Sequence, residues 1–268
     1  MLTVIIFAHR DVVFANTRGM KEMAYWEAKY SYKGELLPPS YRIFERDSFL
    51  FQHLKKELAG KVLIEIGCLF PYEVMTVLNP REYDYTYIGV DIAKSALKAA
   101  HDYVPAGMFV RCSATCLPFK EGLFDIMLSL GVIHHLPGGS DNIPQLCRVL
   151  KDGGVFVLTE AVERRTLSAF EKLRNSSSSP REGRLKPEEL IRACMESGKI
   201  IHFFKNNSIV LGLFSLLIDL YPILQESKAY LRFITVIDQF AIRTMKGISP
   251  FFDAGAYFVI FKKMQCMV

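Results

Sequence analysis

The sequence predicts an α/β fold: a doubly wound, mostly parallel sheet of seven strands, with an N-terminal helical segment and an insertion before the last strand. Between residues 61 and 159, five short apolar runs each lead into a turn or a helix-like segment, an alternation typical of right-handed crossovers. Two further strand-like segments, 199–205 and 256–262, complete the sheet. A chain of 268 residues is long enough to bury the core of one such domain and to carry insertions.

The stretch KVLIEIGCLFP, residues 61–71, is predicted to hold the first core strand and the turn after it. Its apolar residues indicate a buried strand, and Pro71 stands where a helix over 71–78 can begin without losing a hydrogen bond. In parallel α/β sheets, ligands bind outside the carboxyl ends of the strands, because backbone amides and helix dipoles converge there. We therefore expect a ligand site at this junction.

The other core elements are predicted from apolar runs bounded by turn residues and from helix-like spacing. Runs rich in Val, Ile, Leu and Phe indicate strands buried on both faces, and an Ala- and Lys-rich segment indicates a surface helix. The predicted strands are 85–90, 108–111, 124–130 and 155–159; the predicted helices are 93–101, 143–150 and 187–197; turns are expected at 117–119 and 151–154.

Residues 1–58 are predicted to form a cap or lid on a core made of residues 59–206 and 251–268. Six aromatic residues between positions 25 and 44 either close over a substrate or pack helices against the sheet, and packing is the more common use of such rings. The first eleven residues hold an apolar run with no basic residue before it and no cleavage site. We expect an edge strand there rather than a signal peptide.

Residues 207–250 are predicted to be an apolar helical insertion within the same domain, after a polar loop at 175–184. The insertion's segment 209–224 is interrupted by Asp219 and Pro222 and is shorter than the ~20 residues that cross a bilayer. No transmembrane span is expected. A buried cap helix is the favoured interpretation, and peripheral docking on a membrane surface or on a second subunit is the alternative.

Charge and cysteine usage argue against several functional classes. The net charge of +5 is spread over scattered basic residues, so a nucleic-acid partner is not expected. The six cysteines show neither a CxxC pair nor the spacing of zinc ligands. This pattern predicts no metal site and a reducing, cytoplasmic location.

Six short segments of the core occur in an informative order and spacing. They are EIGC at 65–68, IGVD at 88–91, CLPF at 116–119, FDIMLS at 124–129, HHLP at 134–137 and RVLKDGG at 148–154. Together they resemble class I S-adenosylmethionine-dependent methyltransferases, and more narrowly the type 11 methyltransferase-domain group. The resemblance implies a Rossmann-like methyltransferase fold, S-adenosylmethionine as the cofactor and transfer of its methyl group.

Asp91 is the candidate for holding the cofactor's ribose, because a carboxylate at the end of a second strand can accept hydrogen bonds from both ribose hydroxyls. Its alternative role is to cap the following helix, and its place 24 residues after Gly67 favours the ribose. By resemblance to the family, Glu65 and Gly67 would line the methionine part, and Ile92 would flank the adenine. Cys68 is also a candidate cofactor-binding residue.

The resemblance also assigns two residue pairs farther along the chain. Ser113 and Ala114 would meet the adenine edge, and Ser129 and Leu130 would face the cofactor near the sulfonium. Three positions depart from the family pattern: Leu69 and Pro71 replace glycines, and Ser113 replaces an aspartate. A leucine held at positive φ costs on the order of 1 kcal/mol. The alternative function is therefore a non-catalytic or cofactor-impaired relative that acts as a binding module.

Methyl transfer is an in-line displacement, so the protein mainly has to align the acceptor and exclude water. A general base helps when the acceptor carries a proton, and the candidates are His134 and His135; His135 is favoured, and the other ring is expected to be structural. The apolar segments around the core predict a small-molecule or lipid-like acceptor. A nicotinamide oxidoreductase is disfavoured because the GxGxxG motif is missing.

Overall fold

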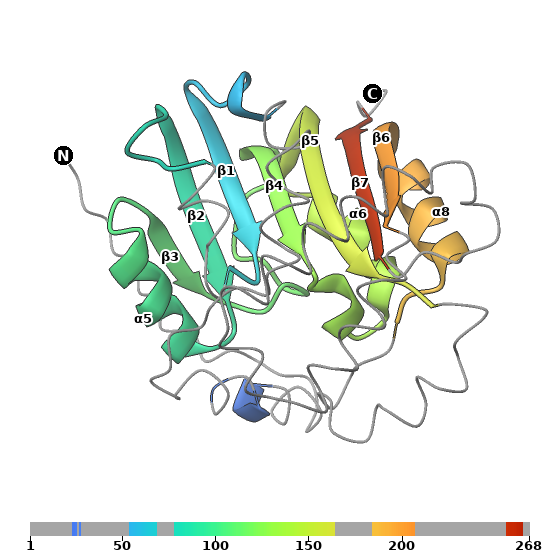
Figure 1. Ribbon diagram of the computed structural model, residues 1–268, viewed down its shortest axis with the longest axis horizontal. Coiled ribbons are helices and arrows are strands. Elements are labelled where there is room, and N and C mark those ends of the chain that lie inside the picture. The colour runs from blue at the N-terminus through green and yellow to red at the C-terminus, as the bar shows by residue number, and fades with distance from the viewer. Residues whose placement is uncertain are drawn as a thin grey trace, which may run out of the picture.

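The computed structural model describes residues 23–25, 27, 54–68, 78–163, 184–206 and 256–264. The described strands form one seven-stranded sheet in the order β3-β2-β1-β4-β5-β7-β6 (Figure 1). The predicted fold class, an α/β fold with a mostly parallel sheet, is confirmed.

Five strands run parallel. The central strand β1 (Lys61–Ile66) lies between β2 (Tyr85–Asp91) and β4 (Phe124–Leu130), with β3 (Met108–Arg111) and β5 (Leu150–Ala161) outside them. In β1, four consecutive residues from Leu63 to Ile66 are buried, as expected for a strand covered on both faces.

The last two strands differ in direction from the rest. β7 (Ala256–Lys263) lies between β5 and β6 (Gly198–Asn206) and is antiparallel to both. The sequence predicted these two strands within one residue of their bounds. It did not predict that the later strand would be inserted between the two earlier ones.

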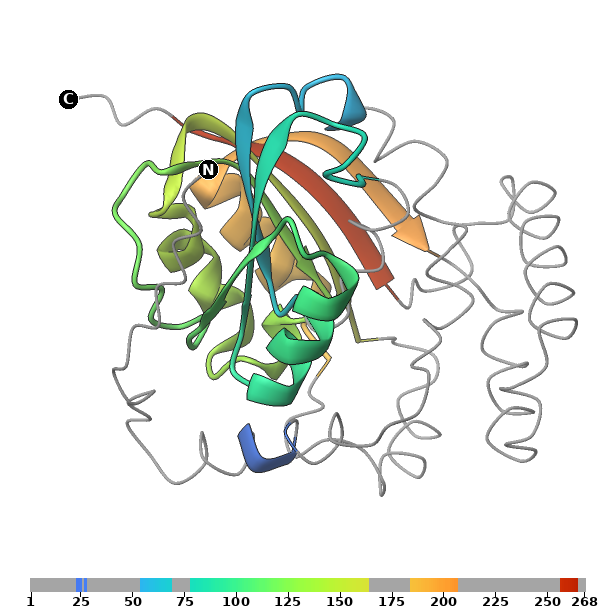
Figure 2. The same cartoon turned by 90° about the vertical axis from the view of Figure 1, so that its left-hand side faces the viewer.

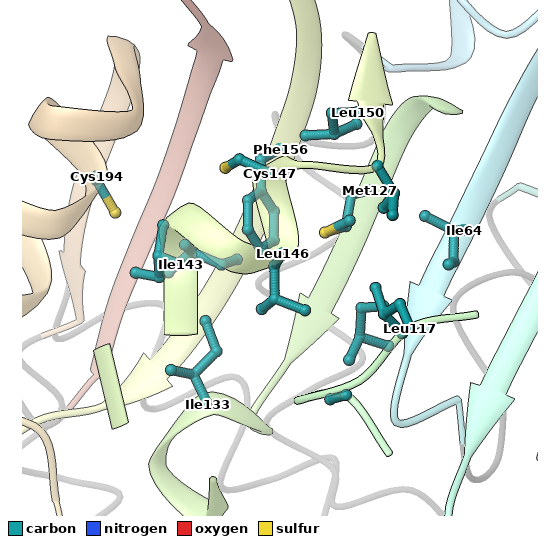
Figure 3. Packing of buried hydrophobic residues seen from close by; sticks show 14 of the residues in the cluster. Ile64, Leu117, Met127, Ile133, Ile143, Leu146, Cys147, Leu150, Phe156 and Cys194 are labelled. Carbon is teal, nitrogen blue, oxygen red and sulfur yellow. The ribbon is translucent and has the colours of Figure 1, made fainter. Parts of the chain in front are cut away.

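Helices cover both faces of the sheet. On one face, α5 (Lys94–Tyr103) buries Leu97 and Ala100 beside Phe109 of β3. On the other face, α6 (Ile143–Cys147) and α8 (Pro187–Ser197) pack against the same hydrophobic cluster. Figure 3 shows Ile143, Leu146 and Cys147 among the side chains of this cluster, which also contains Phe156 and Met127 of the neighbouring strands. The prediction of a doubly wound arrangement is therefore correct.

The region around α6 corrects two predicted boundaries. The helix predicted over 143–150 ends at Cys147, because Leu150 instead pairs with Phe124 in the sheet. The turn predicted over 151–154 falls within the bounds of β5 as an irregularity, where the register passes from the pair Phe124–Leu150 to the pair Ile126–Val155. The residues between bulge out, and Gly153 takes a φ of 73° there.

Several predicted segments lie outside the described residues. These are the first strand-like segment, nearly all of the helix predicted over 71–78, the loop at 175–184 except its last residue, and the insertion at 207–250 with its segment 209–224. Of the predicted cap, the structure describes residues 23–25, 27 and 54–58. Within the described ranges, no helix combines the length and the apolar character needed to cross a membrane.

Candidate active site

The predicted site residues gather at one edge of the sheet, the lower edge in Figure 1, where β1, β2 and β4 end. Because these strands are parallel, their carboxyl ends meet there. The residues brought to this edge are Gly67 and Cys68 after β1, Asp91 and Ile92 at the end of β2, Ser113 and Ala114 after β3, Ser129 and Leu130 at the end of β4, and the two histidines of the 3-10 helix η1 (Ile133–His135).

The turn after β1 passes tightly against the loop that follows β4. Gly67 takes a φ of 65°, and a Cβ atom added to it would lie 2.6 Å from Cγ2 of Val132. Both the backbone conformation and the close neighbour therefore require glycine. Leu69 and Pro71, which replace two family glycines, lie outside the described residues.

Cys68 holds this turn to β2 through its backbone. Its N–H donates to the carbonyl oxygen of Val90 at 3.0 Å, while its side chain is buried in a cluster with Leu97 and Ala100. Burial, followed by the nearby carboxylates of Asp91 and Glu65, raises the pKa of the Cys68 thiol. A ligand at the carboxyl edge would therefore meet the backbone of Cys68 rather than its thiol.

Asp91 stands at the end of β2 with a partly buried side chain. Its Oδ1 accepts a hydrogen bond from the N–H of Ala93 at 2.9 Å, and its backbone carbonyl accepts one from Cys112 at 3.1 Å. The N-cap of α5 is Ala93, with no side-chain capping bond. Asp91 thus stabilises the turn before the helix, and each oxygen of a carboxylate can accept more than one hydrogen bond.

Part of the predicted cap reaches the same edge. The Glu27 carboxylate accepts hydrogen bonds from the N–H of Ser95 at 3.2 Å and from its hydroxyl at 3.0 Å. On the neighbouring strand, the Arg111 guanidinium contacts Sδ of Met23 at 3.3 Å and donates to the carbonyl of Ile92 at 3.0 Å. Figure 2 shows this short N-terminal stretch beside the first turn of α5.

Glu65 is buried within the sheet, with 3% of its surface exposed. Tyr87 of the adjacent strand donates its hydroxyl hydrogen to Oε2 of Glu65 at 2.7 Å. Burial and the Glu65 carboxylate both raise the pKa of Tyr87, so the phenol stays protonated and keeps donating. This bond fixes the orientation of the Glu65 side chain, two residues before Gly67.

The predicted serines differ in how their hydroxyls are used. Ser113 forms a hydrogen bond with the Thr115 hydroxyl at 2.8 Å and accepts from the Thr115 N–H at 3.3 Å, which closes a small turn next to the buried Ala114. Ser129 is fully buried at the end of β4, and its hydroxyl has no hydrogen-bond partner in the described part of the chain. Its neighbour Leu130 is also buried.

A residue that the sequence did not indicate organises the loop after β4. Glu160, near the end of β5, is buried, and Oε1 accepts hydrogen bonds from the N–H groups of Val132 and Ile133 at 3.1 and 2.8 Å. Oε2 accepts from the N–H of His134 at 3.2 Å and lies 2.7 Å from Nδ1 of the same histidine. The one available signal was an acidic residue that closes a buried apolar strand.

Residues 64–158 match a known family of protein domains. Over this range the chain matches the family model described as a methyltransferase domain, of the type 11 group. The match starts within β1 and ends within β5, so it covers all of β2, β3 and β4 and parts of the two other parallel strands. Residues 64–158 therefore resemble a methyltransferase domain. The family resemblance predicted from the sequence is confirmed.

One curated relative of this domain is the phthiotriol/phenolphthiotriol dimycocerosates methyltransferase 1 of Mycobacterium ulcerans (strain Agy99). It is 29% identical over 106 residues, which amounts to 39% of this chain and 39% of the relative. The match thus spans about two fifths of the relative's length. What the whole chain acts on does not follow from it.

Solved structures extend the likeness beyond the matched domain. The [4+2]-cyclase SpnF has a TM-score of 0.60 at 14% identity, covering 93% of this chain and 96% of its own. The geranyl diphosphate C-methyltransferase from Streptomyces coelicolor A3(2), in complex with Mg2+, geranyl diphosphate and S-adenosyl-L-homocysteine, has a TM-score of 0.59 at 12% identity, covering 94% and 99%. At such low identity these structures establish the shared fold alone.

Proposed function

We propose that the chain is an S-adenosylmethionine-dependent methyltransferase that acts on a small-molecule or lipid-like acceptor. The observation that carries the proposal is the convergence of the Gly67 turn, the Asp91 carboxylate and the buried Ser129 hydroxyl at one edge of a methyltransferase domain. No two of these residues are close in sequence.

The residues at this edge fit the cofactor. The Asp91 carboxylate would accept bonds from the ribose, and the Gly67 turn would let the backbone approach the methionine part, above Glu65. A buried hydroxyl without a partner is destabilising by about 1–3 kcal/mol, and a polar ligand group near Ser129 would remove that penalty. Ile92, Ser113 and Ala114 would remain the candidates for the adenine, and Leu130 for the neighbourhood of the sulfonium. When bound, the cofactor supplies an electrophilic methyl group.

The acceptor assignment has two supports. First, the names of the M. ulcerans relative and of the S. coelicolor methyltransferase refer to lipid-like or isoprenoid substrates of those two proteins. In this chain, the cap at 1–58 and the insertion at 207–250 are rich in apolar residues and are proposed to cover the site, with residues 59–206 and 251–268 as the core. We also propose a cytoplasmic location, supported by the five described cysteines, which are free thiols.

A second candidate function is a binding module that has lost methyl transfer. Leu69, Pro71 and Ser113 favour it, because each departs from the family pattern at a cofactor position. The [4+2]-cyclase SpnF, which shares the fold, illustrates that a fold does not determine the reaction.

Calorimetric titration with S-adenosylmethionine and S-adenosylhomocysteine separates the two candidates. We expect both ligands to bind, and we expect Asp91→Ala to weaken binding by about 1–3 kcal/mol through loss of charge-assisted hydrogen bonds to the ribose. Asp102→Ala, an exposed aspartate on α5, is the matched control and should bind as the wild type does. Absence of heat at high micromolar ligand would refute the enzyme, and unchanged affinity of folded Asp91→Ala would refute the ribose assignment.

A further inference from the structure

The loop after β4 is built around one buried carboxylate. The side chain of Glu160 is 0% exposed, and it accepts backbone hydrogen bonds from three consecutive residues of the loop as well as the contact with the His134 ring. Several donors satisfy the oxygens of this buried carboxylate and hold it in one orientation. Glu160 therefore fixes both the path of η1 and the position of the His134 ring.

The contact between Glu160 and His134 selects one tautomer of the imidazole. A carboxylate oxygen accepts hydrogen bonds, so the 2.7 Å contact favours the tautomer in which Nδ1 carries the hydrogen and donates it. The opposite ring nitrogen, Nε2, is then the unprotonated one in the neutral ring, and it has no hydrogen-bond partner among the described residues. A carboxylate behind an imidazole orients the ring and stabilises the cation that forms when Nε2 takes up a proton.

The position of the His134 ring is set by the pairing of β4 with β5. Leu130 pairs with Thr159, and the N–H of Gly131 donates to the carbonyl of Thr159 at 2.7 Å. This pairing brings Glu160 level with the loop that begins as β4 ends. His134 consequently follows within a few residues of Ser129 and Leu130, the pair assigned to the sulfonium end of the cofactor.

The adjacent His135 contacts the His134 ring. Its ring lies against that of His134, with centroids 4.0 Å apart and planes inclined by 41°. The Glu160 carboxylate orients the His134 ring, and the two rings contact each other at a tilt. This carboxylate contact favours His134 as the base, whereas the sequence favoured His135.

We propose that Glu160 is a positioning residue for methyl transfer: it holds His134 with Nε2 unprotonated, as the base that accepts a proton from an acceptor hydroxyl. This inference rests on the proposed function. The acceptor oxygen forms a bond to the methyl carbon as the carbon–sulfur bond breaks and its electron pair stays on sulfur. The hydroxyl proton moves to Nε2 of His134, whose new positive charge lies against the Glu160 carboxylate.

Nitrogen-15 NMR of the full chain labelled at histidine tests the proposal without knowledge of the acceptor. The His134 and His135 signals are assigned with His134→Asn and His135→Asn. Two probes are compared: S-adenosylhomocysteine, which lacks the methyl group, and sinefungin, which carries an amine at the methyl position. We expect wild-type His134 to show a protonated Nδ1 and an unprotonated Nε2, and sinefungin to shift the Nε2 signal at least twofold more than S-adenosylhomocysteine does.

The variants separate positioning from folding. In Glu160→Gln, the nitrogen-15 signals of His134 should indicate a mixture of tautomers and should shift less with sinefungin. The affinity of this variant for S-adenosylhomocysteine should stay within about threefold of the wild type. Glu160→Asp, which keeps the charge, should restore part of the response. Glu163→Gln makes the same chemical change at an exposed glutamate and should alter neither. If Glu160→Gln fails to fold, the comparison of the two probes on the wild-type protein still tests the proposed role of His134.

Three results would overturn the inference. The first is a hydrogen on Nε2 of wild-type His134 in place of Nδ1. The second is binding of both probes with no difference in the His134 signals, which would leave Glu160 a purely structural residue. The third is a response to sinefungin at His135 alone. Failure of both probes to bind would instead overturn the proposed function, and the base role with it.

Discussion

Substitution of Gly67 by alanine should destabilise the protein through two separable effects. The first is backbone strain: a φ of 65° in a residue with a Cβ costs about 1 kcal/mol. The second is steric, because the new Cβ would lie 2.6 Å from Cγ2 of Val132, and overpacking of this kind costs about 1–3 kcal/mol. The sum predicts a loss of about 2–4 kcal/mol in the free energy of unfolding.

The chain offers a control that isolates the strain. Gly122 has nearly the same φ, 63°, but nothing lies within 4 Å of an added Cβ there. Urea denaturation of Gly67→Ala and Gly122→Ala gives both free energies of unfolding, and their difference measures the contact with Val132. We expect Gly122→Ala to lose about 1 kcal/mol and Gly67→Ala to lose more.

A double variant tests the contact directly. In Gly67→Ala combined with Val132→Ala, the nearest remaining atom of residue 132 is its Cβ, 3.5 Å away, which is an ordinary contact. The double variant should therefore be more stable than the sum of the single changes predicts, by about 1–3 kcal/mol. Equal losses in Gly67→Ala and Gly122→Ala, or strictly additive losses in the double variant, would refute the close approach of these two loops.

Two further predictions concern titratable groups. Burial raises the pKa of Asp125, but bonds from the Val62 N–H and the Lys151 ammonium outweigh it, so the pKa lies below its ordinary value of 3.8. Asp125→Asn should lower the free energy of unfolding by about 1 kcal/mol at pH 7. The stability difference between variant and wild type should shrink as the pH falls from 3.8 through the lower pKa of the folded state, because the wild-type carboxylate becomes protonated there. A stability difference independent of pH would contradict this. Burial raises the pKa of Cys147 to about 12, whereas Cys116 is exposed, so iodoacetamide at pH 8 should label Cys116 much faster, as mass spectrometry of the peptides would show; equal labelling would count against the burial.

The sequence predicted the core strands well because their signals are local. The strand at 124–130 and the helix at 187–197 have the bounds predicted from their apolar runs and, for the helix, from its opening proline. The end of α6 was wrong because Leu150 fits a helix pattern as well as a strand, and its pairing with Phe124 decided between them. Local patterns do not contain that information.

The candidate site was predictable where a motif marks it and not where tertiary contacts build it. The motif at the end of β2 indicated Asp91 as a candidate. Glu160, in contrast, accepts hydrogen bonds from residues 26 to 28 positions earlier in the chain. Glu27 similarly meets Ser95 across 68 positions. Each contact exists because the sheet brings two strand ends together, and no spacing rule in the sequence expresses it. The ligand roles assigned to individual residues remain predictions.

The insertion of β7 between β5 and β6 also has a consequence for how the molecule assembles. Among the described strands, β6 pairs only with β7, so its ladder hydrogen bonds cannot form until residues 256–263 are in place. Until then, β5 presents an open edge on the side away from β4. Such edges recruit other chains, and pairing over long sequence separation is slow. A chain interrupted between 207 and 255 would keep the parallel strands of the site and expose two aggregation-prone edges.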